Sequence, residues 1–183
     1  MLLNNYHHLK NKEIYRLILI ILLSIVVRVP IIFLFGDITL DHEWKYLVHN
    51  LVTHGKLVYQ SLDGFLLPNL WMPPLYAYYL YFFTFFNLEN QNYIILILLS
   101  QTLLASVSVA IFYKINKFFF SEKISFYSSL IFSLFPLHLY ACSQISSISL
   151  QIFLSILFFY FLFLFVEKKI PYQWRSFRSL EVY

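Results

Sequence analysis

The sequence predicts an all-α polytopic membrane protein, with about four transmembrane helices and two outer interfacial helices. Of the 183 residues, 60% are hydrophobic and 12% are charged, and the mean hydropathy of +0.70 lies outside the range of soluble domains. The apolar residues come in runs long enough to cross a bilayer. Lys and Arg cluster beside those runs, so orientation in a membrane explains the net charge of +4 better than nucleic-acid binding does.

Composition excludes several kinds of site. Three glycines are too few for a Gly-rich phosphate loop, and they form no GxxxG helix-pairing motif. The single cysteine, Cys142, excludes an internal disulfide and a cysteine-based metal cluster. We therefore expect no cofactor; a divalent metal is conceivable, but the sequence does not support one.

The first crossing is predicted at residues 14–35, after a polar, basic cytoplasmic N-terminus at residues 1–13. About 22 residues make a helix of roughly 33 Å, which is enough to cross. The alternative is a signal peptide, but no small-x-small cleavage site follows and the apolar stretch is too long. Arg28 interrupts the far end; it must snorkel or find a carboxylate, because a buried unpaired charge costs several kcal/mol.

Residues 36–74 form the one long stretch that is not hydrocarbon-like. It holds four of the nine acidic residues and three of the six histidines. Within it, residues 41–54 have a helical pattern that Asp41 can cap and Gly55 can stop. One apolar stripe is predicted for Trp44, Leu47, Val48, Leu51 and Val52, with Glu43, Lys45, His49, Asn50 and Thr53 facing elsewhere. The pattern favours a short helix lying on the membrane surface.

The following segments alternate between apolar runs and polar connections. After Pro73 and Pro74, which set an extended lead into a helix, only about 12 apolar residues remain, and that is short for a crossing. Crossings are predicted at residues 93–113, 124–140 and 150–166. They are separated by a basic loop at 114–123 and a Ser-rich connection at 143–149, and a polar, basic tail follows at 167–183.

Charge bias decides how the chain is oriented. If residues 69–86 stay at the outer surface, both termini and the basic loop lie inside, and the outer loop is 36–92. Ten of the thirteen Lys and Arg residues are then cytoplasmic: Lys10, Lys12, Arg16, Lys114, Lys117, Lys123, Lys168, Lys169, Arg175 and Arg178. We therefore predict a multi-pass protein of the plasma (inner) membrane with both termini in the cytoplasm.

Polar residues in the outer stretch allow more than one interpretation. Asp41 or Glu43 could act as a general base toward an acceptor group. Both residues also fit a structural role at a helix N-terminus, where Asp41 pairs with Lys45. His42 and His49 lie two turns apart on one helix face, but no third residue has a metal-ligand spacing to them. Solvated side chains at the membrane interface therefore explain His42, His49 and His54 better than a metal site does.

The order of these features resembles the start of the GT-C membrane glycosyltransferases, in particular the protein-mannosyltransferase and aminoarabinose-transferase-like group. The resemblance covers residues 14–166 as one transmembrane module. It rests on a first crossing that ends with an arginine, an acidic residue that opens an amphipathic helix, and a later helix introduced by two prolines. The matching residues are Arg28, Asp41, Trp44, Asn50, Leu51, Gly55, Pro73, Pro74, Leu75 and Tyr76, with Pro136 further on.

This resemblance implies transfer of a sugar from a polyprenyl-phosphate donor to an acceptor outside the cytoplasm, as in cell-envelope or protein glycosylation. Asp41 matches the first-loop carboxylate that is the family's proposed base. Phosphate needs cationic partners, for which Arg28 and Lys45 are candidates by position. Glu43 and Tyr76 complete the candidate substrate-binding residues.

The sequence departs from the family pattern in two ways, and both weigh against catalysis by this chain alone. Ile148 stands where a second acidic residue is expected, and the chain has about four crossings where family members have many more. We therefore expect an N-terminal fragment from a truncated or split gene, completed by a second polypeptide. The alternative is a non-catalytic membrane remnant or a subunit of a glycosylation system. A transporter is less favoured, because the crossings carry few polar residues that could face each other.

Overall fold

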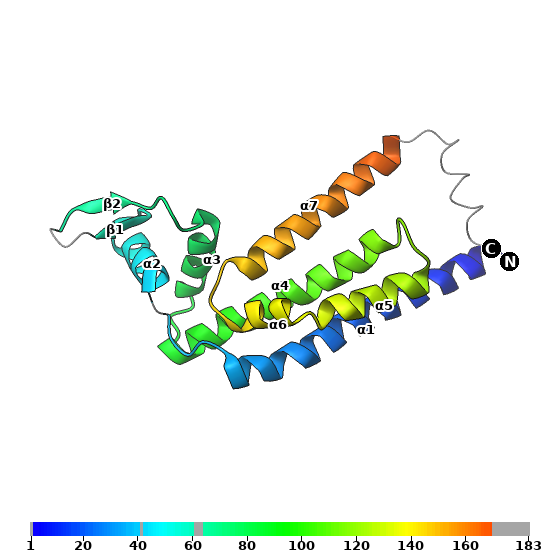
Figure 1. The fold of residues 1–183 in the computed structure, drawn as a ribbon, viewed down its shortest axis with the longest axis horizontal. Coiled ribbons are helices and arrows are strands. Elements are labelled where there is room, and N and C mark those ends of the chain that lie inside the picture. The colour runs from blue at the N-terminus through cyan, green and yellow to red at the C-terminus, as the bar shows by residue number, and fades with distance from the viewer. Residues whose placement is uncertain (1, 41, 61–63, 170–183) are drawn as a thin grey trace.

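The computed structural model describes residues 2–40, 42–60 and 64–169 (Figure 1). Over this part of the chain there are seven helices and one antiparallel pair of strands. The elements are α1 (Leu2–Phe35), α2 (His42–His54), β1 (Val58–Gln60), β2 (Leu66–Pro68), α3 (Pro74–Thr84), α4 (Asn90–Asn116), α5 (Glu122–Ser133), α6 (Pro136–Ser143) and α7 (Ile148–Lys169).

The helices confirm the predicted class as a mostly helical protein with segments of membrane-crossing length. Three helical stretches are long and apolar enough to cross: Asn11–Phe35 in α1, Asn90–Asn116 in α4 and Ile148–Glu167 in α7. Helices α5 and α6 meet at an angle of 51° and would supply a fourth crossing if they act as one span.

Helix α4 is the centre of the bundle, since it packs against α1, α3, α5, α6 and α7. Figure 1 shows α1, α4 and α5 running side by side, and α7 packs along α4. Small side chains on the buried faces, including Ala105, Ser106 and Ala110, let the helix backbones approach closely.

Helix α5 turns a row of serines toward its neighbours. Ser125, Ser129 and Ser133 recur every four residues and are all buried. The Ser125 and Ser129 hydroxyls donate to the carbonyls of Ser121 and Ser125, at 2.9 and 2.7 Å. These bonds satisfy the hydroxyls within the helix, so the row can pack against α1 and α4 without an unpaired polar group.

Ion pairs join α1 to α5 and to the turn after α4, at the end of the bundle that holds the N-terminus of α1. Arg16 pairs with Glu122, and Lys117 lies 3.0 Å from Glu13 and 3.8 Å from Glu122. All four side chains are partly exposed, so each pair contributes at most about 1 kcal/mol. Their effect is to hold α1 against the turn between α4 and α5.

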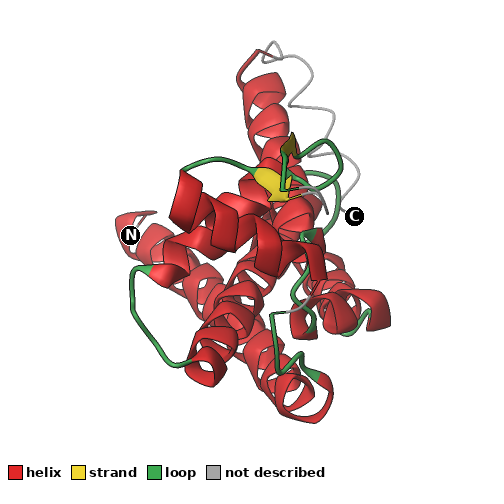
Figure 2. Cartoon of the chain, turned by 90° about the vertical axis from the view of Figure 1, so that its left-hand side faces the viewer, coloured by secondary structure: helices red, strands yellow, loops and turns green. Residues whose placement is uncertain are grey.

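At the opposite end, α2, β1, β2 and α3 form a group that caps the bundle; Figure 2 shows it from that side. Tyr59 is paired with Leu67 at the centre of the strand pair. A buried apolar cluster joins this group to the bundle, drawing on α1, α2, α3, α4 and the connection after α6. Its buried residues are Ile32, Val48, Tyr76, Leu80, Phe83, Tyr93, Ile94, Ile97, Leu98 and Ile145.

Several predicted elements are confirmed. Helix α2 ends at His54, as expected from Gly55, and Gly55 adopts the left-handed φ of 65° that favours glycine. Helix α3 begins at Pro74 after an extended Pro73. With 11 residues, α3 is about 16 Å long, too short to cross a bilayer.

Other predictions need correction. Helix α1 begins at Leu2, so residues 2–13 are helical and continuous with the first crossing, and their cytoplasmic location stays a prediction. The apolar run 124–140 is not one helix: Pro136 starts α6, because proline lacks an N–H and holds Phe135 extended. The strand pair was not predicted. In α2, Val52 is exposed, whereas Asn50 is buried and donates to the Val58 carbonyl at 2.7 Å.

A buried hydrogen bond gives a direct test of how α3 is attached to α4. The Tyr76 hydroxyl donates to Gln101 Oε1 at 3.0 Å, and both side chains are fully buried. Tyr76→Phe should lower the free energy of unfolding by about 1–3 kcal/mol, because it leaves a buried amide oxygen without its donor. Thermal unfolding of the detergent-solubilised protein measures the loss as a lower Tm.

Tyr78→Phe is the matched control, since Tyr78 belongs to the same helix but is half exposed. Its expected change is within about 0.5 kcal/mol. Equal Tm values for the two variants would contradict a stabilising role for the Tyr76–Gln101 bond.

Candidate functional site

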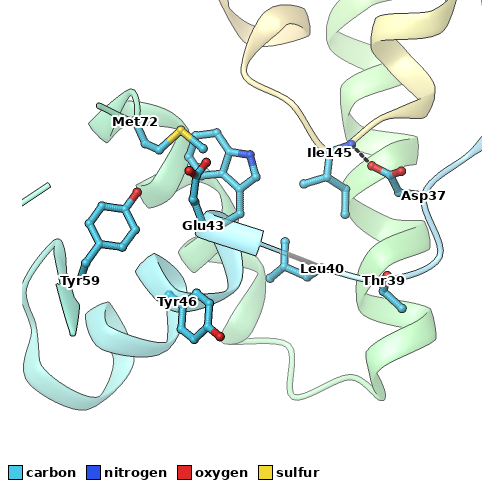
Figure 3. Close-up of a pocket in the computed structure, with 9 residues that line it drawn as sticks. Asp37, Thr39, Leu40, Glu43, Tyr46, Tyr59, Met72 and Ile145 are labelled. Carbon is cyan, nitrogen blue, oxygen red and sulfur yellow. Dashed lines mark hydrogen bonds between the residues drawn. The ribbon is translucent and has the colours of Figure 1, made fainter. Parts of the chain in front are cut away.

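A cavity of about 700 Å³ lies where the group formed by α2, β1, β2 and α3 meets the bundle. It opens between the connection from α1 to α2, the first turns of α2, β1, the segment before α3 and the connection from α6 to α7 (Figure 3). Its lining residues are Asp37, Thr39, Leu40, Glu43, Trp44, Tyr46, Tyr59, Met72 and Ile145.

Asp37 fixes one side of the cavity. Its backbone N–H donates to the Ser143 carbonyl at 3.0 Å, and its carboxylate Oδ2 accepts the Ile145 N–H at 2.6 Å. Figure 3 shows the second bond across the gap between the two connections. A carboxylate that accepts a backbone N–H makes a strong, charge-assisted bond. Asp37 therefore ties the end of α1 to the connection between α6 and α7.

Glu43 and two apolar or aromatic side chains form the other side. Figure 3 shows Glu43 beside Tyr59 and Met72, with Asp37 on the far side of the cavity. The bond from Asn50 to Val58 fixes β1, and therefore Tyr59, against α2. Asn69 accepts the Met72 N–H at 3.0 Å and donates to the Met72 carbonyl at 2.8 Å.

Trp44 connects this wall to the core. Its ring meets the Tyr76 ring edge-on, with the centroids 4.8 Å apart. Such aromatic pairs contribute about 0.5–1.5 kcal/mol beyond the area they bury. Because Tyr76 is bonded to Gln101, the indole is anchored through α3 to the central helix α4.

The described wall of the cavity is acidic. It carries the carboxylates of Asp37 and Glu43, and no Lys, Arg or His is among the nine residues that line it. Burial, reinforced by the negative charge of Glu43, raises the pKa of Tyr59, so its phenol stays protonated at neutral pH. Carboxylate acceptors, a phenol donor and an indole face suit a polyhydroxylated ligand.

The structure brings only part of the predicted site together. Asp41 lies outside the described residues. Glu43 lines the acidic cavity, whereas Tyr76 is buried behind Trp44. Lys45 lines a separate hollow with His49, and Arg28 is buried within the bundle.

Arg28 corrects one expectation in particular. It neither snorkels nor meets a carboxylate in the described part of the chain. Its guanidinium donates instead to the carbonyl and hydroxyl of Ser24, to the Ser133 hydroxyl at 3.1 Å and to His138 Nδ1 at 3.1 Å.

Asp37, Tyr59 and Met72 are among the lining residues that were not predicted from the sequence. Asp37 had a usable signal, since it is the first charged residue after an apolar crossing. Tyr59 and Met72 had none, because each is positioned by a side-chain bond to the backbone that no periodic pattern records. Within residues 2–40, 42–60 and 64–169, no three His, Cys, Asp or Glu side chains are placed to hold a metal ion.

The fold and the cavity together define a class: a helical protein with helices of membrane-crossing length and an acidic, aromatic pocket at one end of the bundle. Comparison with models of protein families, with curated proteins and with solved structures found no match to this chain.

The bond between Asp37 and Ile145 can be tested by hydrogen exchange. Asp37→Ala should speed exchange at the Ile145 amide, because opening that bond no longer costs the roughly 1.5–3 kcal/mol of a charged hydrogen bond. Asp37→Asn keeps an acceptor oxygen and should have a smaller effect. Ile38→Ala, at the exposed neighbouring residue, serves as the control. Unchanged exchange at Ile145 in Asp37→Ala would contradict the assignment of this contact.

Proposed function

We propose that this chain is a GT-C-like membrane glycosyltransferase, which transfers a sugar from a polyprenyl-phosphate donor to an acceptor outside the cytoplasm. The observation that carries the proposal is the pair of carboxylates, Asp37 and Glu43, in an aromatic-walled cavity at the end of a bundle of membrane-length helices. A lipid-linked donor requires a site of this kind, within reach of both a membrane and a soluble acceptor.

The proposed topology has four crossings, with α5 and α6 acting as one bent span, in a plasma membrane. Both termini are cytoplasmic, and α2 and α3 lie at the outer surface. The shortness of α3 supports this arrangement, since a fifth crossing there would need about 20 residues. The cluster of Arg16, Lys114 and Lys117 at the opposite end of the bundle agrees with a cytoplasmic location.

The reaction requires a base and a leaving group. A carboxylate takes the proton from the acceptor hydroxyl as its oxygen attacks the anomeric carbon. The bond between that carbon and the donor phosphate oxygen breaks, and the lipid phosphate leaves with the electron pair. Glu43, which lines the cavity, is a candidate for proton removal, and Asp41 is the residue that the family resemblance favours. The Asp37 carboxylate accepts the Ile145 N–H.

The donor phosphate needs a cation that the described wall of the cavity does not supply. Arg28 is committed to serines and a histidine inside the bundle. Lys45 is exposed on α2 and lines a separate hollow, and it is the candidate cation for the phosphate by its position in the sequence.

The acidic wall also favours the second candidate function, a non-catalytic subunit that binds a sugar. Carboxylates and an indole can bind neutral glycans, whereas the same carboxylates repel a phosphate that has no cation beside it. This alternative differs from the first in predicting sugar binding without transfer.

A transfer assay separates the two functions. Membranes that carry the protein are supplied with a radiolabelled polyprenyl-phosphate sugar, and label in the acceptor fraction is measured. Replacing the general base, by Glu43→Gln or Asp41→Asn, should lower the rate about 10²–10⁴-fold.

Glu89→Gln is the matched control, because Glu89 is exposed in the connection before α4 and does not line the cavity. Its rate should equal that of the unaltered chain. Full activity in both base variants would remove these carboxylates from the reaction. Absence of transfer by the unaltered chain, together with retained sugar binding, would favour the non-catalytic function.

A further inference from the structure

A second hollow beside α2 carries basic side chains. It has a volume of about 390 Å³, within the range of small-ligand pockets, and lies between α2 and the connection from α3 to α4. Lys45 and His49 of α2 line it on one side, and Asn87 and Asn90 line it on the other. None of the described residues that line it carries a carboxylate, and the exposed Glu89 beside Asn90 is not among them.

Helix α2 separates acidic from basic side chains. Glu43 lines the acidic cavity together with Asp37, whereas Lys45 and His49 line the second hollow, and Leu40 lines both. Glu43 and Lys45 are two positions apart, so they leave the helix toward nearly opposite sides. A ligand in the second hollow therefore meets a positive charge without a described carboxylate beside it, and this favours an anion.

The hydrogen-bond donors of this hollow are accessible and uncommitted. Four exposed side chains that can donate make no bond to another described residue: Lys45, His49, Asn87 and Asn90. The hydroxyls of Thr84 and Tyr93, which also line the hollow, already donate to backbone carbonyls at 2.7 and 2.9 Å. Hydrogen bonds from a lysine to a phosphate or carboxylate are charge-assisted and therefore strong.

The position of the hollow indicates which kind of anion it meets. Asn90 is the first residue of α4, a helix long and apolar enough to cross a membrane, so the hollow lies at one end of that crossing. Phe85, Phe86 and Leu88, in the connection just before α4, are large exposed apolar side chains. Aromatic residues in such a place are typical of the level of lipid headgroups. Basic and exposed apolar groups side by side favour an amphiphile over a soluble anion.

We propose that the hollow between α2 and the connection from α3 to α4 binds the headgroup of one anionic phospholipid of the bilayer. Its phosphate accepts hydrogen bonds from Lys45 and His49, and its hydrocarbon chains lie along Phe86 and Leu88. A zwitterionic lipid is disfavoured, because its cationic group meets Lys45 and no described carboxylate in the hollow. The proposal requires that the chain lies in a membrane, but it does not require the transfer of a sugar.

Photo-crosslinking of the full chain in nanodiscs tests the proposal. The probes are phosphatidylglycerol and phosphatidylcholine, each with the same photoreactive group next to the headgroup. Mass spectrometry measures the labelling of peptides that contain α2 and residues 84–93. Phosphatidylglycerol should label them about fivefold more than phosphatidylcholine, which corresponds to about 1 kcal/mol. Inorganic phosphate at constant ionic strength should leave this labelling unchanged, and a reduction would overturn the lipid assignment in favour of a soluble phosphate.

Two pairs of variants show whether the hollow itself is responsible. Lys45→Gln should lower labelling by phosphatidylglycerol to the level of phosphatidylcholine, and His49→Gln should lower it in part. Lys56→Gln and His54→Gln are the matched controls, because both residues are exposed at or just after the end of α2 and do not line the hollow. Their labelling should equal that of the unaltered chain. Equal labelling by the two lipids, or equal labelling of Lys45→Gln and Lys56→Gln, would overturn the proposal.

Discussion

One buried amide, that of Gln101, holds together the end of the molecule that carries α2 and α3. It accepts the Tyr76 hydroxyl from α3 and donates to the Gln144 carbonyl at 3.0 Å. Gln144 in turn donates to the Phe35 carbonyl at 2.9 Å, at the end of α1. Apolar packing is weakly directional, whereas a buried amide must be matched at each of its polar atoms. The relative positions of α1, α3, α4 and the connection after α6 are therefore set here, and the acidic cavity with them.

Helix α6 links the two polar sites. His138, near its start, is bonded to the buried Arg28, and Ser143, at its end, accepts the Asp37 N–H beside the acidic cavity. The break at Pro136 makes this possible, because it turns an eight-residue helix out of the line of α5. One short helix thus contacts the buried Arg28 near its start and the residues of the acidic cavity at its end.

The elements that depend on local pattern could be predicted from the sequence. Helical spacing predicts α2, and adjacent prolines predict the start of α3. Contacts between distant residues could not be predicted: Arg28 and His138 are 110 positions apart, and Asp37 and Ile145 are 108 apart. The strand pair was missed because each strand has only three residues, too few to show alternation. Of the predicted site residues, Glu43 lines the cavity, and its role stays a prediction. The positions of Asp37 and Tyr59 depend on partners that only the fold brings near.

The central claim is that the acidic cavity faces outward, across the membrane from the ion pairs of Arg16 and Lys117. Cysteine labelling with a membrane-impermeant maleimide tests it, and the native Cys142 is buried, so it should give little background. Asn90→Cys marks the outer end of α4, and Ser121→Cys, also exposed, marks the inner turn. In intact cells we expect labelling at position 90 and none at position 121 until the membrane is permeabilised. Labelling at position 90 only after permeabilisation would contradict the account.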